Sequence, residues 1–233
     1  MASVLFVVSA ADGWTQKDGS VHPTGYWAEE LAVPHQLFSD AGWDITVATP
    51  NAVAPTLDKM SLGEGAGDPK DLEKISAYLE SIKSELDAPK SLADVNEADY
   101  DLVFYPGGHG PMEDLAVDSV SGALLTQRLA AGTPLALLCH APAAILAAKN
   151  EDGTNAFAGK QVTAFSNTEE ESTGLAENAK WLLESELVNA GVKYDKAAED
   201  WSSHVVVDGN LYTGQNPQSS EELAKRILAD LDK

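Results

Sequence analysis

The stretch TPLALLCHAPAAIL, residues 133–146, joins a short apolar run to the start of a helical pattern, with a cysteine at the junction. The run that ends at Leu138 is typical of a buried strand, and Pro142 suits the first turn of a helix. A strand that turns abruptly into a helix displays the turn residue above the sheet edge, near the positive end of the helix dipole. We therefore predict an α/β fold that presents Cys139 with the character of a thiolate.

Cys139 is the only cysteine of the chain, and two interpretations of it stay open at this point. Free cysteine is often buried and usually behaves as a small, inert hydrophobic residue. The adjacent His140, and the end of the apolar run at the sulfur, favour a reactive thiol instead. A single cysteine cannot form an internal disulfide, which fits the reducing cytoplasm, so we expect a cytoplasmic protein.

The rest of the chain alternates short apolar runs with helical periodicity, as in an open, mostly parallel sheet covered by helices on both faces. We expect strands at Val4–Ser9, Asp44–Thr49, Leu102–Tyr105, Pro134–Leu138, Gln161–Ala164 and Val205–Val207, the last followed by a hairpin turn. We expect helices at Tyr26–Ala41, Pro69–Leu86, Ser121–Ala131, Ala141–Ala148, Glu177–Ala190 and Ser219–Asp230.

Length and composition predict a single domain over residues 1–233, because 44% hydrophobic residues can form one sizeable core. Gly, Pro and Asp are frequent from Asn51 to about Asp68, which breaks the rhythm of strands and helices. We therefore expect a surface excursion there, and we expect it to belong to a helical insertion at about 51–98, which also contains the helix expected at Pro69–Leu86. No run approaches the roughly 20 apolar residues of a membrane span, and no secretory signal is recognisable, so no membrane partner is expected.

The charge balance argues against one class of partner. Thirty-seven acidic and 15 basic residues give a formal charge of −22. Such a field repels phosphate backbones and anionic membrane surfaces. We expect no nucleic-acid partner, and we interpret the charge as a solubility trait of the surface.

Ligands of a parallel sheet bind beyond the carboxyl ends of the strands, so the segments that follow the strands are the places to search. YPGGHG, residues 105–110, follows one strand, and its consecutive glycines, Gly107 and Gly108, can turn backbone N–H groups toward developing negative charge. A plain tight turn is the alternative.

The first predicted helix carries a proline inside its pattern. Pro34 lacks the N–H that would bond the carbonyl of Glu30, and Glu30 lies beside the face expected to be buried. A buried carboxyl has a raised pKa and can share a proton with a thiol or substrate. We expect Glu29 to be an exposed helix acid and Thr24 to be the N-cap.

The acidic segment SNTEEES, residues 166–172, follows the fifth predicted strand. Acids at a helix N-terminus are commonly solvated, but one of these could orient a histidine as the third member of a Cys–His–acid set. No metal site is expected, because the histidines show no paired spacing. They are His22, His35, His109, His140 and His204.

In combination and in this order, the segments resemble the ThiJ/PfpI superfamily over essentially the whole chain. They are TGYWAEEL (24–31) with Pro34, DYDLVFYPGGHG (99–110), LCHAP (138–142), FSNTEEE (165–171) and TGQNP (213–217). The resemblance implies a three-layer, flavodoxin-like sandwich. The insertion and the glutamate-rich segment look most similar to the heat-shock chaperone and glyoxalase III branch, which is associated with cofactor-independent, glutathione-independent conversion of methylglyoxal to D-lactate.

Carried over by position, the resemblance assigns a role to each motif. It implies a nucleophile, a base, an acid against the sulfur and an acid that orients the base, which are Cys139, His140, Glu30 and Glu170, with Glu169 or Glu171 as alternatives to Glu170. It also implies an oxyanion and substrate pocket made by Gly107, Gly108, His109 and the backbone after Cys139. A small reactive aldehyde as substrate and a homodimer are further expectations.

Other functions stay open on the sequence. A stress chaperone or redox-responsive holdase would not need the thiol for catalysis, and a deglycase of glycated amines would use the same thiol chemistry. A cysteine peptidase or an amidotransferase shares the fold, which by itself supports neither activity. The amidotransferase pattern is also incomplete, because His204 has no suitable acid two residues later.

Overall fold

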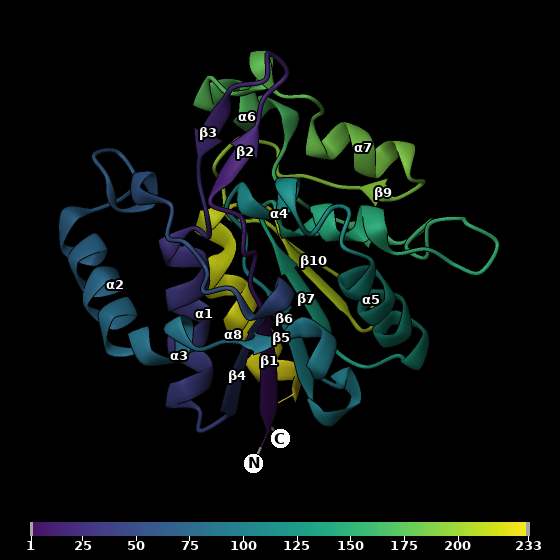
Figure 1. The fold of residues 1–233 in the computed structure, drawn as a ribbon, viewed down its shortest axis with the longest axis horizontal. Helices are drawn as coiled ribbons and strands as arrows, with labels where there is room; N and C mark the ends of the chain where they lie inside the picture. Colours follow the sequence, from purple (N-terminus) through teal and green to yellow (C-terminus); the bar gives the residue numbers. More distant parts are fainter. Residues whose placement is uncertain (1, 232–233) are drawn as a thin grey trace.

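Seven strands form the main sheet of the structure, a computed structural model that describes residues 2–231 (Figure 1). In spatial order they are β10 (Val205–Asp208), β11 (Leu211–Gly214), β7 (Leu135–Leu138), β6 (Leu102–Tyr105), β1 (Ser3–Val7), β4 (Asp44–Thr49) and β5 (Lys90–Ser91). All neighbours are parallel except β10 and β11, which form the predicted hairpin. The expected mostly parallel α/β fold is confirmed.

Helices lie on both sides of this sheet. Those of α type are α1 (Ala28–Asp40), α2 (Pro69–Ser81), α3 (Lys83–Asp87), α4 (Gly110–Glu113), α5 (Ser119–Ala131), α6 (Asn167–Thr173), α7 (Leu183–Asn189) and α8 (Ser220–Leu231). The short 3₁₀ helices are η1 (Pro50–Ala52), η2 (Lys59–Leu62), η3 (Leu92–Asp94), η4 (Glu97–Asp99), η5 (Ala141–Ala147), η6 (Ala176–Asn178) and η7 (Pro217–Ser219). Helices α1 and α8 pack together on one side of the sheet, and α5 and η5 pack together on the other (Figure 1).

Two small sheets lie outside the main one. Strands β2 (Gly13–Thr15) and β3 (Val21–Pro23) form an antiparallel hairpin, and β8 (Gln161–Val162) pairs with β9 (Lys193–Tyr194). The β2–β3 hairpin and α6 lie together at one end of the main sheet (Figure 1). That end is where the candidate site forms.

The central strands are buried on both faces, as expected for a parallel sheet. The ring centroid of Phe6 in β1 lies 5.0 Å from that of Phe104 in β6 and 6.1 Å from that of Phe38 in α1. Each buried ring contributes about 1.5–3 kcal/mol relative to exposure to water. This cluster holds α1 against the sheet and thereby fixes the position of Glu30 on the same helix.

The segment expected to form an insertion, residues 51–98, carries α2 and α3, and α2 packs on the outer side of α1. The hydroxyl of Tyr78 in α2 lies 2.9 Å from His35 Nδ1, and Glu85 Oε2 of α3 lies 3.4 Å from His35 Nε2. The single helix predicted at Pro69–Leu86 is interrupted at Ile82. These contacts tie the segment to the helix that bears Glu30.

The prediction that Thr24 is the N-cap of α1 is wrong. The N-cap is Trp27, and the Thr24 hydroxyl donates to Asp58 at 2.9 Å. The helix begins later because Tyr26 is extended and bridges to Leu57, with its N–H donating to the carbonyl of Thr56 at 2.8 Å.

The strand predicted at Gln161–Ala164 is shorter and does not join the main sheet. Only Gln161–Val162 is extended, as β8, because the sheet edge beside β11 is already taken by β10. Thr163 instead donates its N–H to the side chain of Thr213 at 3.0 Å. Tertiary pairing therefore decided which apolar run completes the sheet.

Two further predicted helices differ from the structure in detail. The segment after Cys139 is helical as predicted, but it is the 3₁₀ helix η5. The helix expected at Glu177–Ala190 is shorter, because η6 and an extended Ala179 precede α7. The carbonyl of Asn178 accepts the N–H of Lys17 at 2.7 Å, a bond to the β2–β3 hairpin instead of a helical one. Among residues 2–231, no helix has the length and apolar character needed to cross a bilayer.

The close approach of α5 to η5 gives a test of this packing. A Cβ added at Gly122 would lie 2.2 Å from the carbonyl oxygen of Ala147. Although alanine normally favours a helix, we expect Gly122→Ala to lower the free energy of unfolding by about 1–3 kcal/mol through overpacking. The exposed neighbour gives the control, since Ala123→Gly should cost about 1 kcal/mol from propensity alone. Urea unfolding measures both; unchanged stability of Gly122→Ala would contradict the close approach.

Candidate active site

Cys139 lies at the carboxyl end of β7 in a backbone conformation that is rare for a residue with a side chain. Its φ is +59°, in the left-handed region. The turn is held by its neighbours, since its N–H donates to Gly214 and its carbonyl accepts from Phe165, both at 2.9 Å. Strained residues persist where the surrounding structure over-determines them, often at functional sites. The thiol is 3% exposed and lines a pocket with Glu30 and His140.

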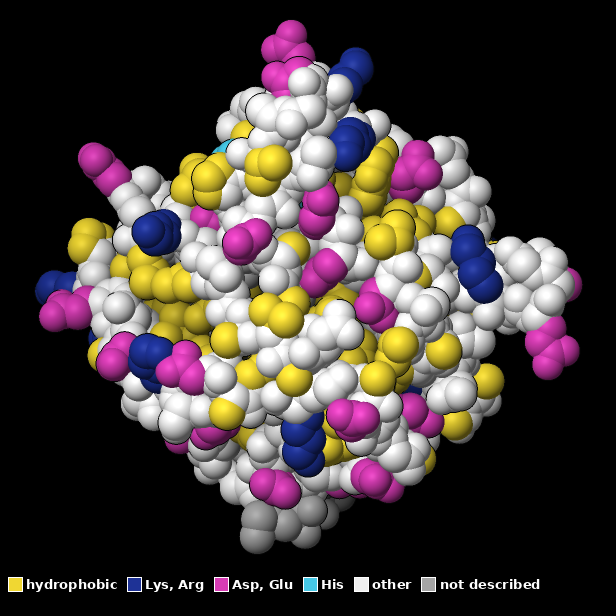
Figure 2. All heavy atoms as spheres, in the orientation of Figure 1, with side chains coloured by type: hydrophobic (Ala, Val, Ile, Leu, Met, Phe, Trp, Pro, Cys, Tyr) yellow, Lys and Arg dark blue, Asp and Glu magenta, His cyan; other side chains and the backbone are white. Residues whose placement is uncertain are grey.

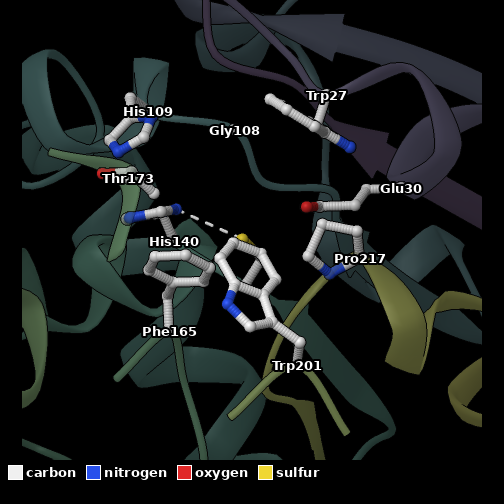
Figure 3. A pocket seen from close by; sticks show the side chains of 10 residues that line it. Trp27, Glu30, Gly108, His109, His140, Phe165, Thr173, Trp201 and Pro217 are labelled. Carbon is white, nitrogen blue, oxygen red and sulfur yellow. Dashed lines mark hydrogen bonds between the residues drawn. The ribbon is translucent and has the colours of Figure 1, made fainter. Parts of the chain in front are cut away.

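Glu30, in the first turn of α1, is fully buried with a carboxyl that faces the Cys139 thiol (Figure 3). Its Oε2 accepts the N–H of Gly107 at 2.9 Å, while Oε1 has no well-aligned partner among residues 2–231. Burial raises the pKa of Glu30 well above its ordinary value, against the opposing effect of hydrogen bonds from Cys139 and Gly107. The carboxyl is therefore suited to hold a proton near neutral pH.

Burial also raises the pKa of the Cys139 thiol, and the negative charge of Glu30 raises it further. The two groups thus form a coupled pair that retains at least one proton at neutral pH. Burial of the sulfur beside Glu30 thus acts against the thiolate that the strand-to-helix turn predicted. Glu29, expected to be exposed, is half-buried, and burial raises its pKa to about 7.

His140 connects the sulfur to a carboxylate. Its Nδ1 lies 3.2 Å from Cys139 Sγ, and its Nε2 lies 2.6 Å from Glu170 Oε2. Burial, followed by the neighbouring His109, lowers the pKa of His140 to about 4, so the ring is neutral at pH 7. The carboxylate assigns the proton to Nε2 and leaves Nδ1 free to accept the thiol proton.

The three consecutive glutamates of α6 have separate surroundings, and Glu170 is the one that the structure brings to His140. Glu169 forms a capping box with Ser166, and Glu171 is exposed. Although burial raises the pKa of Glu170, the two histidines bound to it hold that pKa well below its usual range. Glu170 is therefore an anion that orients the imidazole.

His109 is the second histidine on this carboxylate. Its Nε2 lies 2.8 Å from Glu170 Oε1, and its ring lies 4.1 Å from that of His140, between centroids. Trp14 of the β2–β3 hairpin stacks on His109 at 4.7 Å. Although predicted as part of the substrate pocket, His109 thus also belongs to the network that positions the base.

The two glycines predicted to donate to an oxyanion, Gly107 and Gly108, direct their N–H groups to different partners. The Gly107 N–H is engaged by Glu30 and is not free for a substrate oxygen. Gly108, with φ +94°, directs its N–H toward Cys139, where it lowers the thiol pKa. A Cβ at Gly107 would lie 2.5 Å from Glu30 Oε2 and from the carbonyl of Leu138, so only glycine permits this approach.

The pocket above the sulfur is small, with a cavity volume of about 40 Å³. Besides the predicted residues it is lined by five that were not predicted as site residues, which are Trp27, Phe165, Thr173, Trp201 and Pro217 (Figure 3). Trp27, Phe165 and Pro217 lie inside the sequence motifs, which was a usable signal. No sequence signal pointed to Trp201, because its loop lies outside every motif.

Sequence spacing suggested no metal site, but the fold brings three residues with potential ligand atoms together. One nitrogen each of His109 and His140 and an oxygen of Glu170 lie within 4.8 Å of one another. The hydrogen bonds from both rings to the carboxylate account for this cluster as it stands. The three residues are far apart along the chain and come together only in the fold, so their spacing in the sequence did not reveal the cluster.

Comparisons with known proteins agree with this architecture. The DJ-1/PfpI family model matches residues 23–230. The chain is 30% identical to the glutathione-independent glyoxalase hsp3101 of Schizosaccharomyces pombe, over 97% of this chain and 94% of that protein. It is 29% identical to the protein/nucleic acid deglycase HchA of Staphylococcus aureus, over 92% of this chain and 75% of that protein. The solved structure of the rapid encystment protein of Francisella tularensis superposes with a TM-score of 0.87 at 30% identity, over 99% of each chain.

The role of Glu170 in orienting His140 can be tested by comparison with the adjacent Glu171. We expect Glu170→Gln to slow alkylation of Cys139 at pH 7 about tenfold or more, because an amide can donate to His140 Nε2 and move the ring proton to Nδ1. Glu171→Gln changes the same chemistry at an exposed position and should leave the rate unchanged. Iodoacetamide modification followed by mass spectrometry gives both rates; equal rates for the two variants would contradict this geometry.

Proposed function

Because the chain belongs to the DJ-1/PfpI family, we propose that it is a glutathione-independent glyoxalase that converts methylglyoxal to D-lactate, with Cys139 as the nucleophile. The observation that carries the proposal is the joint enclosure of Cys139, His140 and Glu30 in one small cavity. The residues that line this enclosure leave only a small space, which suits a short aldehyde better than a bulky carbonyl compound. A nucleophile, a neutral base and a protonated acid are thus available within one enclosure.

The first step is addition of the thiol to the aldehyde. His140 Nδ1 accepts the thiol proton at 3.2 Å as the S–C bond forms, and the carbonyl oxygen gains the electron pair. The N–H of Gly108, which is directed toward the sulfur, stabilises the oxyanion, together with the backbone after Cys139 that the family resemblance implies. Protonation of that oxygen gives a neutral hemithioacetal.

The second step moves a proton between adjacent carbons. A base removes the proton from the sulfur-bearing carbon to give an enediol, and the second carbon is then protonated, which produces a thioester of lactate. His140 and Glu30 flank the sulfur and can exchange these protons. Water then cleaves the thioester, releases lactate and restores the thiol. Each step uses only side chains, backbone N–H groups and water.

Deglycation is a second candidate, because the relative named HchA is a protein/nucleic acid deglycase and the same thiol addition would serve. Two observations weigh against large substrates. The thiol is almost fully enclosed, and the charge of −22, spread as acidic side chains over the surface seen in Figure 2, disfavours nucleic acid. A small free aldehyde fits both constraints.

Chaperone activity, a homodimer and a cytoplasmic location stay predictions from the sequence. Suppression of aggregation by Cys139→Ala, compared with the parent protein, separates chaperone action from catalysis, since a holdase keeps its activity without the sulfur. Sedimentation analysis gives the oligomeric state.

The proposed activity has a direct test. Formation of D-lactate from methylglyoxal without glutathione should be readily measured for the parent protein and absent for Cys139→Ser. Glu30→Gln keeps the shape of the side chain but removes its acid proton, so we expect a loss of about 10²-fold to 10⁴-fold in kcat. Val117→Ala, at a position that is 78% exposed, is the control. A parental rate for Cys139→Ser would end the proposal.

The low pKa of His140 predicts the acid limb of the pH profile. The ring must be neutral to accept the thiol proton, and its pKa is about 4. Below that pH the ring is protonated and activity falls, whereas from about pH 5 to 7 it stays neutral and this group causes no loss. Measurement of kcat/KM, with tryptophan fluorescence as the check on folding, tests this. Half-maximal activity near pH 6.5, the ordinary histidine value, would contradict it.

A further inference from the structure

Trp201 lies in the loop between β9 and β10, beyond the carboxyl ends of the sheet strands, and forms part of the wall of the Cys139 pocket. Its φ is +63°, a left-handed conformation that bulky residues rarely adopt. It is also 38% exposed, so a need to bury the indole in the core does not explain its placement. A strained, half-solvated tryptophan at the mouth of a reactive site calls for a functional reason.

Several hydrogen bonds hold this residue in place. Its backbone N–H donates to Glu169 Oε1 at 2.9 Å, and its indole N–H donates to Ser172 Oγ at 3.1 Å. On either side of it, Thr168 donates to Asp200 at 2.6 Å and Asn216 donates to the carbonyl of Ser202 at 2.8 Å. The loop is therefore fastened to α6, the same helix that carries Glu170, and to the turn after β11.

The indole also contacts the aromatic wall of the site. It meets Phe165 edge to face at 5.4 Å, and Phe165 in turn packs at 4.3 Å on His140. Figure 3 shows the indole between Phe165 and Pro217, on the pocket side of its loop. With Trp27 it bounds the space above a sulfur that is 3% exposed.

We propose that Trp201 determines substrate size, restricting the site to short 2-oxoaldehydes and excluding carbonyl compounds with bulky substituents. This inference rests on the proposed glyoxalase function and specifies its substrate class. The sulfur must bond the aldehyde carbon, so the rest of the substrate shares the small cavity with the indole. A methyl substituent fits that space, whereas an aromatic ring or a peptide must displace the tryptophan. Because the loop is fastened on both sides of the residue, such displacement is opposed by several hydrogen bonds at once.

The test compares two substrates that share one reacting group. Trp201→Gly removes the indole and relieves the positive φ, and Trp201→Asn is a second truncation that also tolerates that conformation. For each, the ratio of kcat/KM for phenylglyoxal to that for methylglyoxal should rise about tenfold or more. Trp201→Phe retains an aromatic wall and should stay near the parental ratio, as should the remote control Val117→Ala. An unchanged ratio in a folded truncation variant, with folding checked by circular dichroism, overturns the proposal.

A second readout does not depend on the glyoxalase reaction. Since Cys139 is the only cysteine, alkylation by small iodoacetamide and by bulkier N-phenylmaleimide reports access to the sulfur directly. Truncation of Trp201 should raise the rate for the bulky reagent relative to the small one. If the parent protein forms no lactate but this ratio rises, the proposed function fails and the size restriction stands. If lactate forms and neither ratio changes, the size restriction fails and the function stands.

Discussion

The arrangement depends on one contact, the Cys139 thiol against the buried carboxyl of Glu30. Two acidic groups enclosed side by side cannot both ionise cheaply, so they keep a proton between them. That proton is available for a reaction in which a thiol adds to a carbonyl group and protons are transferred between neighbouring atoms. The contact requires the positive φ of Cys139, the start of α1 opposite the end of β7, and a glycine at 107 to let the carboxyl approach.

Helix α6 performs two tasks with adjacent residues. Successive side chains on an α-helix diverge by about 100°, so Glu169 and Glu170 face different neighbours. Glu170 receives His109 and His140, while Glu169 receives the backbone of Trp201 and the side chain of Asn216. One short helix thus links the orientation of the base to the loop that encloses the pocket. A shift of α6 would disturb both at once.

Burial also sets the ionisation of the site. His140 is neutral because it is desolvated, Glu170 is anionic because two histidine rings bind it, and Glu30 is suited to hold a proton because burial raises its pKa. The acidic surface adds a second level of selection, because it disfavours polyanions. An enclosed site under such a surface suits small, uncharged carbonyl compounds.

The sequence alone predicted the parallel sheet, the turn at Cys139, the importance of Glu30 and the restriction to one of three glutamates, because these follow from local apolar periodicity, turn residues and motif order. Only the tertiary structure decided that Glu170 faces His140, that His109 shares that carboxylate, that Gly107 is engaged by Glu30 and that Trp201 covers the pocket. It also enclosed the Cys139 sulfur beside Glu30, where burial raises the pKa of the thiol. The physical reason is that hydrogen-bond partners and desolvation depend on contacts between segments that are distant in the sequence. A short stretch of sequence does not show which distant segments will be in contact.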